Sequence, residues 1–341
     1  MTPTTVATRA PANRRRLIGL LCVGAVLLAL SMLSLAIGTR SIPLATTWRV
    51  LWHPDASVAS DVVHSLRIPR TLLAIGVGAA LGLAGGLMQA LTRNPLAEPG
   101  LLGVNLGAST AVVVAIAFLG VTSLSGYLWF SLVGAAVTSA AVFGLGATGR
   151  SPTPERQLLA GISITAVLGA FVWAVLVSRP IAFDRYRYWD VGSLADREAD
   201  TVVRVAPFLL IGIGLALWLG SRLNALSLGD EAAIAVGARP GRIRALGIVA
   251  VTLLCGAATA AAGPIWFLGL AVPYLARLFT GADHRWVLAY SVLLGPSVLL
   301  ASDLVGRMAV PPAELPVGVV TAFVGAPIFL AICRRRRLAL L

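Results

Sequence analysis

The chain contains one adjacent pair of carboxylates, Asp230-Glu231, within the stretch LGDEAAIAVGARPGR (228–242). Paired carboxylates can carry out general acid–base catalysis, but no nucleophile, metal-ligand set or third catalytic group accompanies this pair. The neighbouring residues favour a structural interpretation, because Gly229 and Asp230 are typical of a helix start and Gly237 of a helix stop. A short helix of small residues is suited to docking into a groove on a partner protein. A solvated loop with two acids is the alternative.

Every one of the 27 basic residues is arginine. A Walker A loop needs a lysine on the nucleotide phosphates, and Schiff-base catalysis needs a lysine amine. The chain can therefore do neither, and any ATP hydrolysis must come from another polypeptide.

Histidine and cysteine offer no alternative chemistry. The histidines are scattered in predicted loops without metal-ligand spacing, which argues against a metal site; they are His53, His64 and His284. The cysteines lie in or at the ends of apolar runs without a CxxC pattern; they are Cys22, Cys255 and Cys333. We expect these cysteines to be small core hydrophobes, and we expect no cofactor in this chain.

The composition places the chain in a membrane. Of 341 residues, 58% are hydrophobic and only 12% are charged, against about a quarter charged in a soluble domain. A net charge of +13 would suggest nucleic acid in a soluble protein, but no basic patch is interleaved with aromatic residues. The excess positive charge instead fits cytoplasmic loops that face anionic lipid.

Uncharged runs as long as a bilayer crossing, about 20 residues, predict an all-α integral membrane protein with about ten transmembrane helices. The long run Pro99–Gly149 divides into two helices at a turn formed by Gly120 and Ser123–Gly126. The run Ala245–Ala276 divides at Gly263-Pro264 into one full helix and a short or broken one. The other predicted spans are Leu17–Ile37, Thr71–Thr92, Gln157–Ser178, Val205–Ser221, Trp286–Ser302 and Leu315–Cys333.

The distribution of arginine predicts the orientation. With the N-terminus inside, 17 of the 27 arginines lie inside and the other 10 outside, in agreement with the positive-inside rule. The apolar run after Arg14–Arg16 is too long for the core of a signal peptide and lacks a clean cleavage site, so we interpret it as a retained helix. We expect cytoplasmic tails over 1–16 and 334–341 and a single transmembrane domain over 17–333.

The stretch TRNPLAEPGLLGVNLG (92–107) interrupts two apolar runs. Pro95, Pro99 and Gly100 cannot continue a regular helix, Asn94 can cap exposed amides, and Glu98 would sit at the positive end of a following helix. Irregular backbone at membrane depth is tolerated where protein buries it or water reaches it. The stretch is either an ordinary cytoplasmic turn or a structured turn packed beside a transport path.

Three amide side chains in the same region also have two interpretations. Hydrogen bonding between helices, worth about 1 kcal/mol or less in membranes, is favoured over lining a path. The amides are Gln89, Asn94 and Asn105.

A weak internal similarity relates RIPRTLLAIGVGAALGLAGG (67–86) to GRIRALGIVAVTLLCGAATA (241–260). Each copy precedes a proline-broken apolar segment, and the two copies would enter the membrane from opposite sides. This pattern is typical of an inverted-topology repeat, although helices rich in Ala, Gly and Leu also resemble one another by chance.

Three predicted outer arginines run against the inside bias, namely Arg67, Arg70 and Arg307. Snorkelling to the membrane interface explains a single such residue well, but it does not explain an Arg-x-x-Arg pair. Exposed guanidinium groups would match the carboxylates of a partner protein.

Longer motifs resemble one family. RIPRTLLAIGVGAALGLAGGLMQALTRNPLAEPGLLGVNLGAS, WDVGSL (189–194), LSLGDEAAIAVGA (226–238), GPIWFLGLAVPYLAR (263–277) and PPAELPVGVVTAFVGAPIFL (311–330) occur in the order typical of FecCD-type permeases. These are membrane subunits of ABC importers for iron-siderophores, haem and cobalamin, and the resemblance covers roughly residues 15–335. It implies the type II ABC importer permease architecture, with ten helices per subunit and a path between two paired subunits.

The resemblance also implies sites and partners. The loop at about 222–243 would be the coupling element that contacts a separate ATPase, which binds ATP and Mg; its residues are Leu228, Gly229, Asp230, Glu231, Ala232, Ala233 and Gly237. Arg67, Arg70 and, less directly, Arg307 would dock an extracytoplasmic substrate-binding protein. Residues 92–107 would form a cytoplasmic-side turn in the frame of a homodimer or a paralogue heterodimer, in the bacterial cytoplasmic (inner) membrane.

The function that follows is import of a ferric siderophore or related iron chelate, with haem and cobalamin as alternatives. A secondary transporter is a more distant alternative, because such proteins carry ionisable residues at mid-membrane and the predicted apolar runs contain none. An intramembrane enzyme is disfavoured, because the chain has no DDxxD or HExxH motif.

Overall fold

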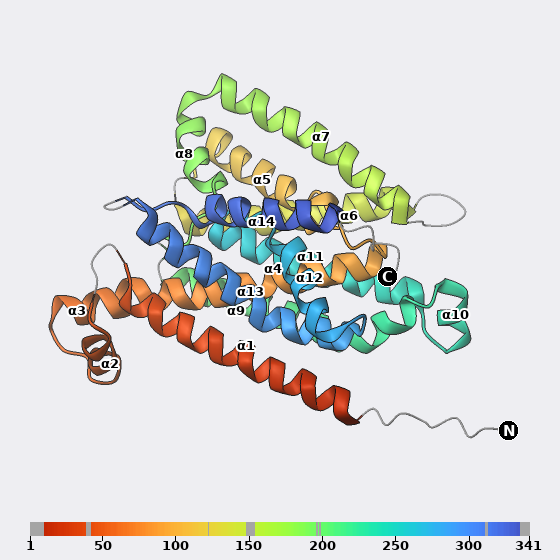
Figure 1. The fold of residues 1–341 in the computed structure, drawn as a ribbon. Coiled ribbons are helices and arrows are strands. Elements are labelled where there is room, and N and C mark those ends of the chain that lie inside the picture. Colours follow the sequence, from red (N-terminus) through yellow and green to blue (C-terminus); the bar gives the residue numbers. More distant parts are fainter. Residues whose placement is uncertain are drawn as a thin grey trace.

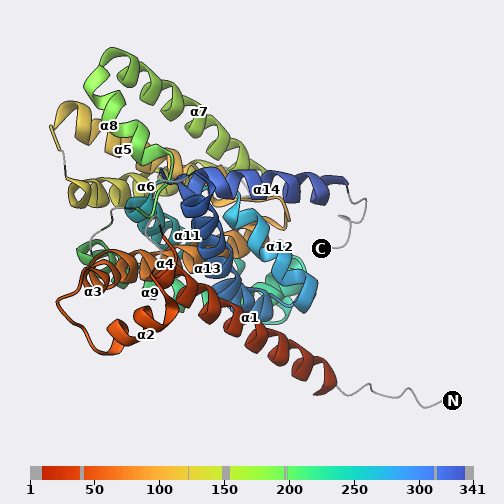
Figure 2. The same cartoon turned by 60° about the vertical axis from the view of Figure 1, so that its left-hand side comes forward.

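The computed structural model describes residues 10–38, 42–121, 123–147, 154–195, 197, 199–310 and 313–334, and every element in these ranges is a helix. Figures 1 and 2 show the helices as one bundle. The elements are α1 (Ala10–Ala36), α2 (Leu44–Trp52), α3 (Val58–Asp61), a π-helical turn η1 (Val62–Arg67), α4 (Ile68–Thr92), a 3₁₀ turn η2 (Pro99–Leu102), α5 (Val104–Phe118), α6 (Leu124–Ala147), α7 (Pro154–Ser178), α8 (Pro180–Asp190), α9 (Ala199–Leu226), α10 (Asp230–Ala235), α11 (Pro240–Ala262), α12 (Leu268–Thr280), α13 (His284–Ala309) and α14 (Val317–Arg334).

Each of the ten predicted apolar helices has a counterpart in the structure. Within the described residues, seven helical segments are long and apolar enough to cross a membrane, and three shorter apolar helices are α5, α12 and part of α14. The predicted break near Gly120 separates α5 from α6, and Gly120 has a φ of 65° there. The all-α class is thus confirmed, while ten membrane crossings remains a prediction.

The helix α4 lies at the centre of the bundle and is surrounded by α9, α11, α12 and α13 (Figures 1 and 2). In its span, 83% of the most apolar window is buried, whereas the corresponding value for α1 is 6%. Glycines allow this close packing: a Cβ on Gly78 would lie 2.6 Å from the Cα of Pro296 in α13, and a Cβ on Gly85 would overlap the backbone of Gly269 in α12. Small residues of this kind are what lets apolar helices approach closely in lipid.

The bundle has two distinct ends. One end, called the α10 end, carries α10 together with the start of α1 and the end of α14 (Figure 1). The other end, called the α8 end, carries α2, α3 and α8 (Figure 1). Residues 1–9 and 335–341 lie outside the described residues, and these include the predicted basic positions Arg9 and Arg335–Arg337.

The predicted break at Gly263-Pro264 is present. The helix α11 ends at Ala262, and five residues without helical structure or in a bend, 263–267, separate it from the 13-residue α12. Gly263 has a φ of 78° and Phe267 a φ of 66°, conformations that normally favour glycine. A Cβ on Gly263 would meet the backbone of Trp189 at the end of α8, so only glycine fits there.

Candidate functional site

The loop between α9 and α11 has the predicted shape. Gly229 (φ 102°) precedes α10, and Gly237 (φ 81°) follows it, so both glycines occupy positions that suit no other residue well. Leu228, two residues before this short helix, and Glu231 within it are exposed, and Ala233 of the same helix is fully buried. The loop therefore presents a small helical knob at the α10 end.

The two adjacent carboxylates of α10 differ in their contacts. Asp230 pairs with Arg93 at the end of α4 (2.5 Å) and with both terminal nitrogens of Arg244 in α11 (2.9 Å each). Glu231 is exposed and makes no ion pair with any residue that the structure describes. Asp230 therefore fastens α10 to the bundle, and the contact of either acid with a partner remains a prediction.

The arginines next to Asp230 also set its protonation. Hydrogen bonds from Arg244, together with those from Arg93, hold the pKa of the Asp230 carboxyl below its ordinary value of 3.8. Asp230 is thus ionised at neutral pH and accepts from both guanidinium groups.

The stretch after α4 is a structured turn. Arg93 ends α4 in the left-handed region (φ 49°), and the side-chain oxygen of Asn94 accepts from the Leu96 N–H (2.9 Å). Asn94 therefore caps a local amide as predicted, and Ala97 N–H donates to the Asn94 carbonyl (3.1 Å). Pro95 lies between Asn94 and Leu96. The short turn η2 begins at Pro99 and contains Gly100.

Glu98 caps a helix other than the predicted one. The sequence placed its carboxylate at the start of the following helix, but η2 receives no side-chain hydrogen bond from it. Its Oε1 instead accepts from the backbone N–H of Phe267 (2.8 Å), the residue before α12. The two proline-broken segments of the proposed repeat are therefore in direct contact, although the repeat itself remains a prediction.

The buried amides join helices. Asn105 accepts from Thr259 of α11 (3.2 Å), and the side chain of Gln89 accepts from Arg277 of α12 and lies 3.4 Å from the carbonyl of Leu270. Both amides are almost fully buried. These contacts agree with the favoured interpretation of bonding between helices.

The three predicted docking arginines are not exposed. Arg67 and Arg307 are 6% and 3% exposed, and their guanidinium groups donate to carbonyls at the end of α1. The acceptors are Leu35 and Ala36 for Arg67, and Ser34 and Ile37 for Arg307. The expectation of exposed guanidinium groups is wrong, because Arg67 and Arg307 cap the C-terminus of α1 and Arg70 pairs with Asp303 and Glu314; docking of a binding protein remains a prediction.

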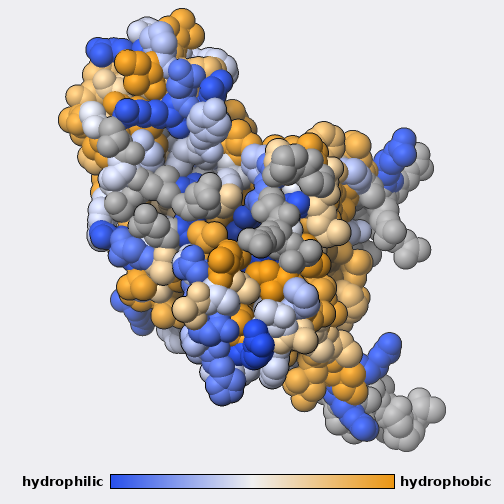
Figure 3. Space-filling model, turned by 90° about the vertical axis from the view of Figure 1, so that its left-hand side faces the viewer, coloured by the Kyte–Doolittle hydropathy of each residue, from blue (hydrophilic) through white to orange (hydrophobic). Residues whose placement is uncertain are grey.

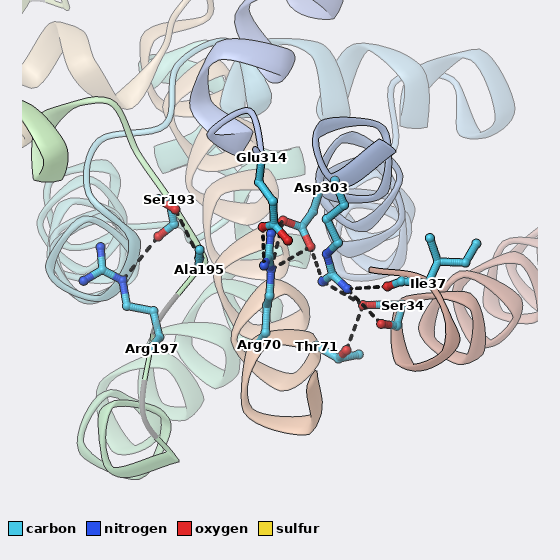
Figure 4. Close-up of polar contacts among 10 residues, drawn as sticks. Ser34, Ile37, Arg70, Thr71, Ser193, Ala195, Arg197, Asp303 and Glu314 are labelled. Carbon is cyan, nitrogen blue, oxygen red and sulfur yellow. Dashed lines mark hydrogen bonds and ion pairs between the residues drawn. The ribbon is translucent and has the colours of Figure 1, made fainter. Parts of the chain in front are cut away.

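Asp303 is the residue that the sequence reasoning missed. It is 1% exposed and lies between Arg70 (2.7 Å) and Arg307, and Arg70 also pairs with Glu314 (2.7 Å) (Figure 4). The predicted span ended at Ser302, whereas α13 continues to Ala309, so this carboxylate fell just outside the predicted apolar run. The i, i+4 spacing of Asp303 and Arg307 on one helix was the signal that could have revealed the pair.

A cavity of about 220 Å³ lies near the α8 end, between α5, α7 and α8. Its lining includes Ser109, Trp173, Tyr186, Asp190 and Trp266. Tyr186 donates to Asp190 (2.7 Å), and this pair, Arg187 and Ser109 are the polar groups in a lining that is otherwise largely aromatic and aliphatic. Among the described residues, no group of three or more His, Cys, Asp or Glu side chains is placed to hold a metal ion.

Together these features define an all-helical, multi-span membrane protein with a short exposed helix, α10, at one end. Its described residues contain no recognisable group of catalytic side chains. Residues 26–335 match the FecCD transport family, and the chain belongs to that family. The ferric enterobactin transport system permease protein FepD of Escherichia coli (strain K12) is 43% identical over 312 residues, which cover 91% of this chain and 93% of that protein.

Two further comparisons agree with this assignment. The hemin transport system permease protein HmuU of Yersinia pestis is 36% identical, with 95% of this chain and 96% of that protein covered. A solved structure described as an inward-facing metal-chelate type ABC transporter has a TM-score of 0.82 and 29% identity, covering 92% of this chain and 98% of that chain. The chain is accordingly an ABC transporter permease.

Proposed function

We propose that this chain is the membrane subunit of an ATP-driven importer whose cargo is a ferric siderophore or a related iron chelate. The observation that carries the proposal is the end-to-end similarity, at 43% identity, to a permease named for ferric enterobactin. Haem remains the second candidate cargo, because a hemin permease is also similar over nearly the whole chain. Cobalamin is a third candidate and rests on the family resemblance alone.

The chain supplies a path and no chemistry of its own. In this proposal, a separate ATPase binds ATP and Mg and contacts the exposed side of the α10 loop, which includes Glu231 of α10 and Leu228 just before it. A second permease subunit, identical or paralogous, completes the path. Nucleic acid has no role.

The α8 end would face outward and receive the binding protein. Figure 3 shows this end, with hydrophilic side chains over α8 at the top and over α2 and α3 at the bottom. Arg185 and Arg187 are exposed in α8, and Arg49 is exposed in α2, so docking carboxylates would meet these arginines before the buried ones. Both termini would then be cytoplasmic, in a bacterial inner membrane.

The test is uptake of radioactive iron in proteoliposomes that contain the permease, its ATPase and its binding protein. We expect a ferric siderophore to be transported, vanadate to stop transport and an uncoupler to leave it intact. Excess hemin or cobalamin as competitors would identify the alternative cargoes. Transport that an uncoupler abolishes and vanadate spares would instead show a secondary transporter.

A further inference from the structure

The loop at 93–98 is attached at both of its ends. At its start, Arg93 donates to Asp230 of α10 (2.5 Å) and to the carbonyl of Leu226 at the end of α9 (2.8 Å). At its C-terminal end, Glu98 accepts a hydrogen bond from the N–H of Phe267 (2.8 Å). Six residues of chain therefore connect the exposed knob at the α10 end to the start of α12.

Internal hydrogen bonds make this loop stiff. Asn94 N–H donates to the Gln89 carbonyl (3.2 Å), which ties the loop to the last turn of α4. The Asn94 side chain and carbonyl accept from the Leu96 and Ala97 amides, and Pro95 fixes one further backbone angle. A short loop with these restraints passes on a displacement instead of absorbing it.

The loop, the end of α4 and α12 are packed as one body. Gln89 of α4 is bonded to Arg277 and lies within reach of the Leu270 carbonyl in α12. Close backbone contact between Gly85 and Gly269 adds to this attachment. Helical hydrogen bonding is interrupted between α11 and α12, in the segment 263–267, so this segment can absorb motion of α12 relative to α11.

The start of α12 reaches the cavity near α8. Trp266, one residue before Phe267, lines that cavity and is 38% exposed. On its other side, a Cβ on Gly100 would lie 2.9 Å from the Trp266 ring, so η2 packs directly against it. Any shift of Glu98 and η2 therefore displaces Trp266 at the cavity.

We infer that Arg93 and Glu98 are positioning residues that transmit a displacement of α10 through the loop 93–98 to Trp266 at the cavity. The inference rests on the proposed function, in which the ATPase displaces α10. The hydrogen bond from Phe267 to Glu98 is the link that carries the motion, and residues 263–265, between α11 and Trp266, are the hinge.

The first experiment separates the hydrogen bond from the charge of Glu98. Glu98→Gln keeps an acceptor oxygen for the Phe267 N–H, whereas Glu98→Leu removes it. In proteoliposomes with the ATPase and binding protein, we expect Glu98→Leu to lower the cargo moved per ATP hydrolysed about two- to tenfold, the effect of one ordinary net hydrogen bond. Glu98→Gln should stay close to the wild-type ratio. Equal ratios for all three proteins, or equal loss in both variants, would overturn the inference.

The second experiment needs no cargo. A single cysteine, Trp266→Cys, is placed in a background without Cys22, Cys255 and Cys333, and maleimide labelling is measured with and without ATP in the assembled complex. We expect ATP to change the labelling rate, and we expect Arg93→Gln to abolish that change while ATP hydrolysis persists. Arg204→Gln is the matched control, because its exposed ion pair with Asp200 (2.6 Å) lies at the start of α9, far from α10 along that helix.

The two proposals fail in different ways. An ATP-dependent change at Trp266→Cys that survives in Arg93→Gln and in Glu98→Leu would overturn the inference, as would labelling that never responds to ATP. A response that depends on Arg93 and Glu98 in a complex that moves no ferric siderophore would support the inference and contradict the proposed cargo. Should Glu98→Leu fail to insert, the Arg93→Gln arm still decides the question.

Discussion

Asp303 and Arg307 form a buried ion pair in α13 with the same i, i+4 spacing as the exposed pair Asp200 and Arg204 in α9. The two pairs differ in burial: the Asp303 and Arg307 side chains are 1% and 2% exposed, against 51% and 43% for the other pair. Removing Arg307 leaves the buried Asp303 with Arg70 as its one remaining partner and takes a donor away from the last carbonyls of α1, whereas an exposed pair is screened by water. The exposed pair is therefore a matched control for how burial changes the free energy that such an ion pair contributes to folding.

We therefore predict that Arg307→Ala destabilises the permease by about 3–5 kcal/mol, while Arg204→Ala costs about 0.5 kcal/mol or less. The measurement is thermal unfolding of purified protein in detergent, with both variants compared with the wild type. The double variant Asp303→Asn with Arg307→Leu should be less destabilised than the sum of its single changes, because both single changes break the same ion pair and that loss is counted once. Equal effects of Arg307→Ala and Arg204→Ala would refute the structural role of the buried cluster.

At the scale of elements, α10 is a helix too short to be stable alone and depends on Asp230 for its position. Because the pKa of Asp230 is lowered in the folded protein, its pairing stabilises the attachment above pH 3.8 and is lost as the pH falls further, through the folded value. The side chain is 42% exposed, so the effect is local and does not measure global stability.

A spin label at Leu228→Cys measures this attachment. We predict low mobility of the label at neutral pH, and rising mobility as the pH is lowered below 3.8. Asp230→Asn should give high mobility that does not depend on pH, and Glu231→Gln should not change the profile, because Glu231 has no ion pair to a described residue. A pH-independent label in the wild type would contradict the anchoring role.

Glycine governs the contact between α4 and α12. Gly85→Ala places a methyl group into the Gly269 backbone, whereas Gly214→Ala in α9 meets nothing within 4 Å. We predict that Gly85→Ala lowers stability by about 1–3 kcal/mol or more, because overpacking forces the helices apart, and that Gly214→Ala raises it slightly, because alanine is the better helix former. Yields of folded, monodisperse protein and midpoints of thermal unfolding test both. A harmless Gly85→Ala would show that α4 and α12 are packed more loosely.

Local elements could be predicted from the sequence and their distant contacts could not. Gly229 and Gly237 bracket α10 because a turn needs positive φ, which is a property of the residues themselves. Asp230 and Arg93 are 137 residues apart, and Glu98 and Phe267 are 169 apart, so no local pattern links them. The exposure of Arg67 and Arg307 was predicted wrongly for the same reason, since their acceptors are backbone carbonyls, which every residue carries.

At the scale of the whole molecule, the fold determines which helix ends lie at the same end of the bundle. The distribution of arginine predicts which end of the bundle faces the cytoplasm. We predict that Ser57→Cys is labelled by an impermeant maleimide in intact cells and that Leu228→Cys is not. Leu228 is preferred to Gly229 as the inner site, because Gly229 has a φ of 102°, which a cysteine would adopt only with strain. Both variants need a background without the three native cysteines. Labelling of Leu228→Cys before lysis would reverse the topology.

The helix α1 lies outermost and is fastened mainly at its two ends. At the α8 end, Arg67 and Arg307 hold its last carbonyls; at the α10 end, Arg16 donates to Thr280 and accepts from Tyr290. During synthesis, Arg67 emerges only 32 residues after its acceptor Leu35, whereas Arg307 follows Ser34 by 273 residues and Tyr290 follows Arg16 by 274. The helix α1 is therefore among the last of the described helices to be secured at both ends, and a nascent chain stalled before α12 would leave it held at one end only.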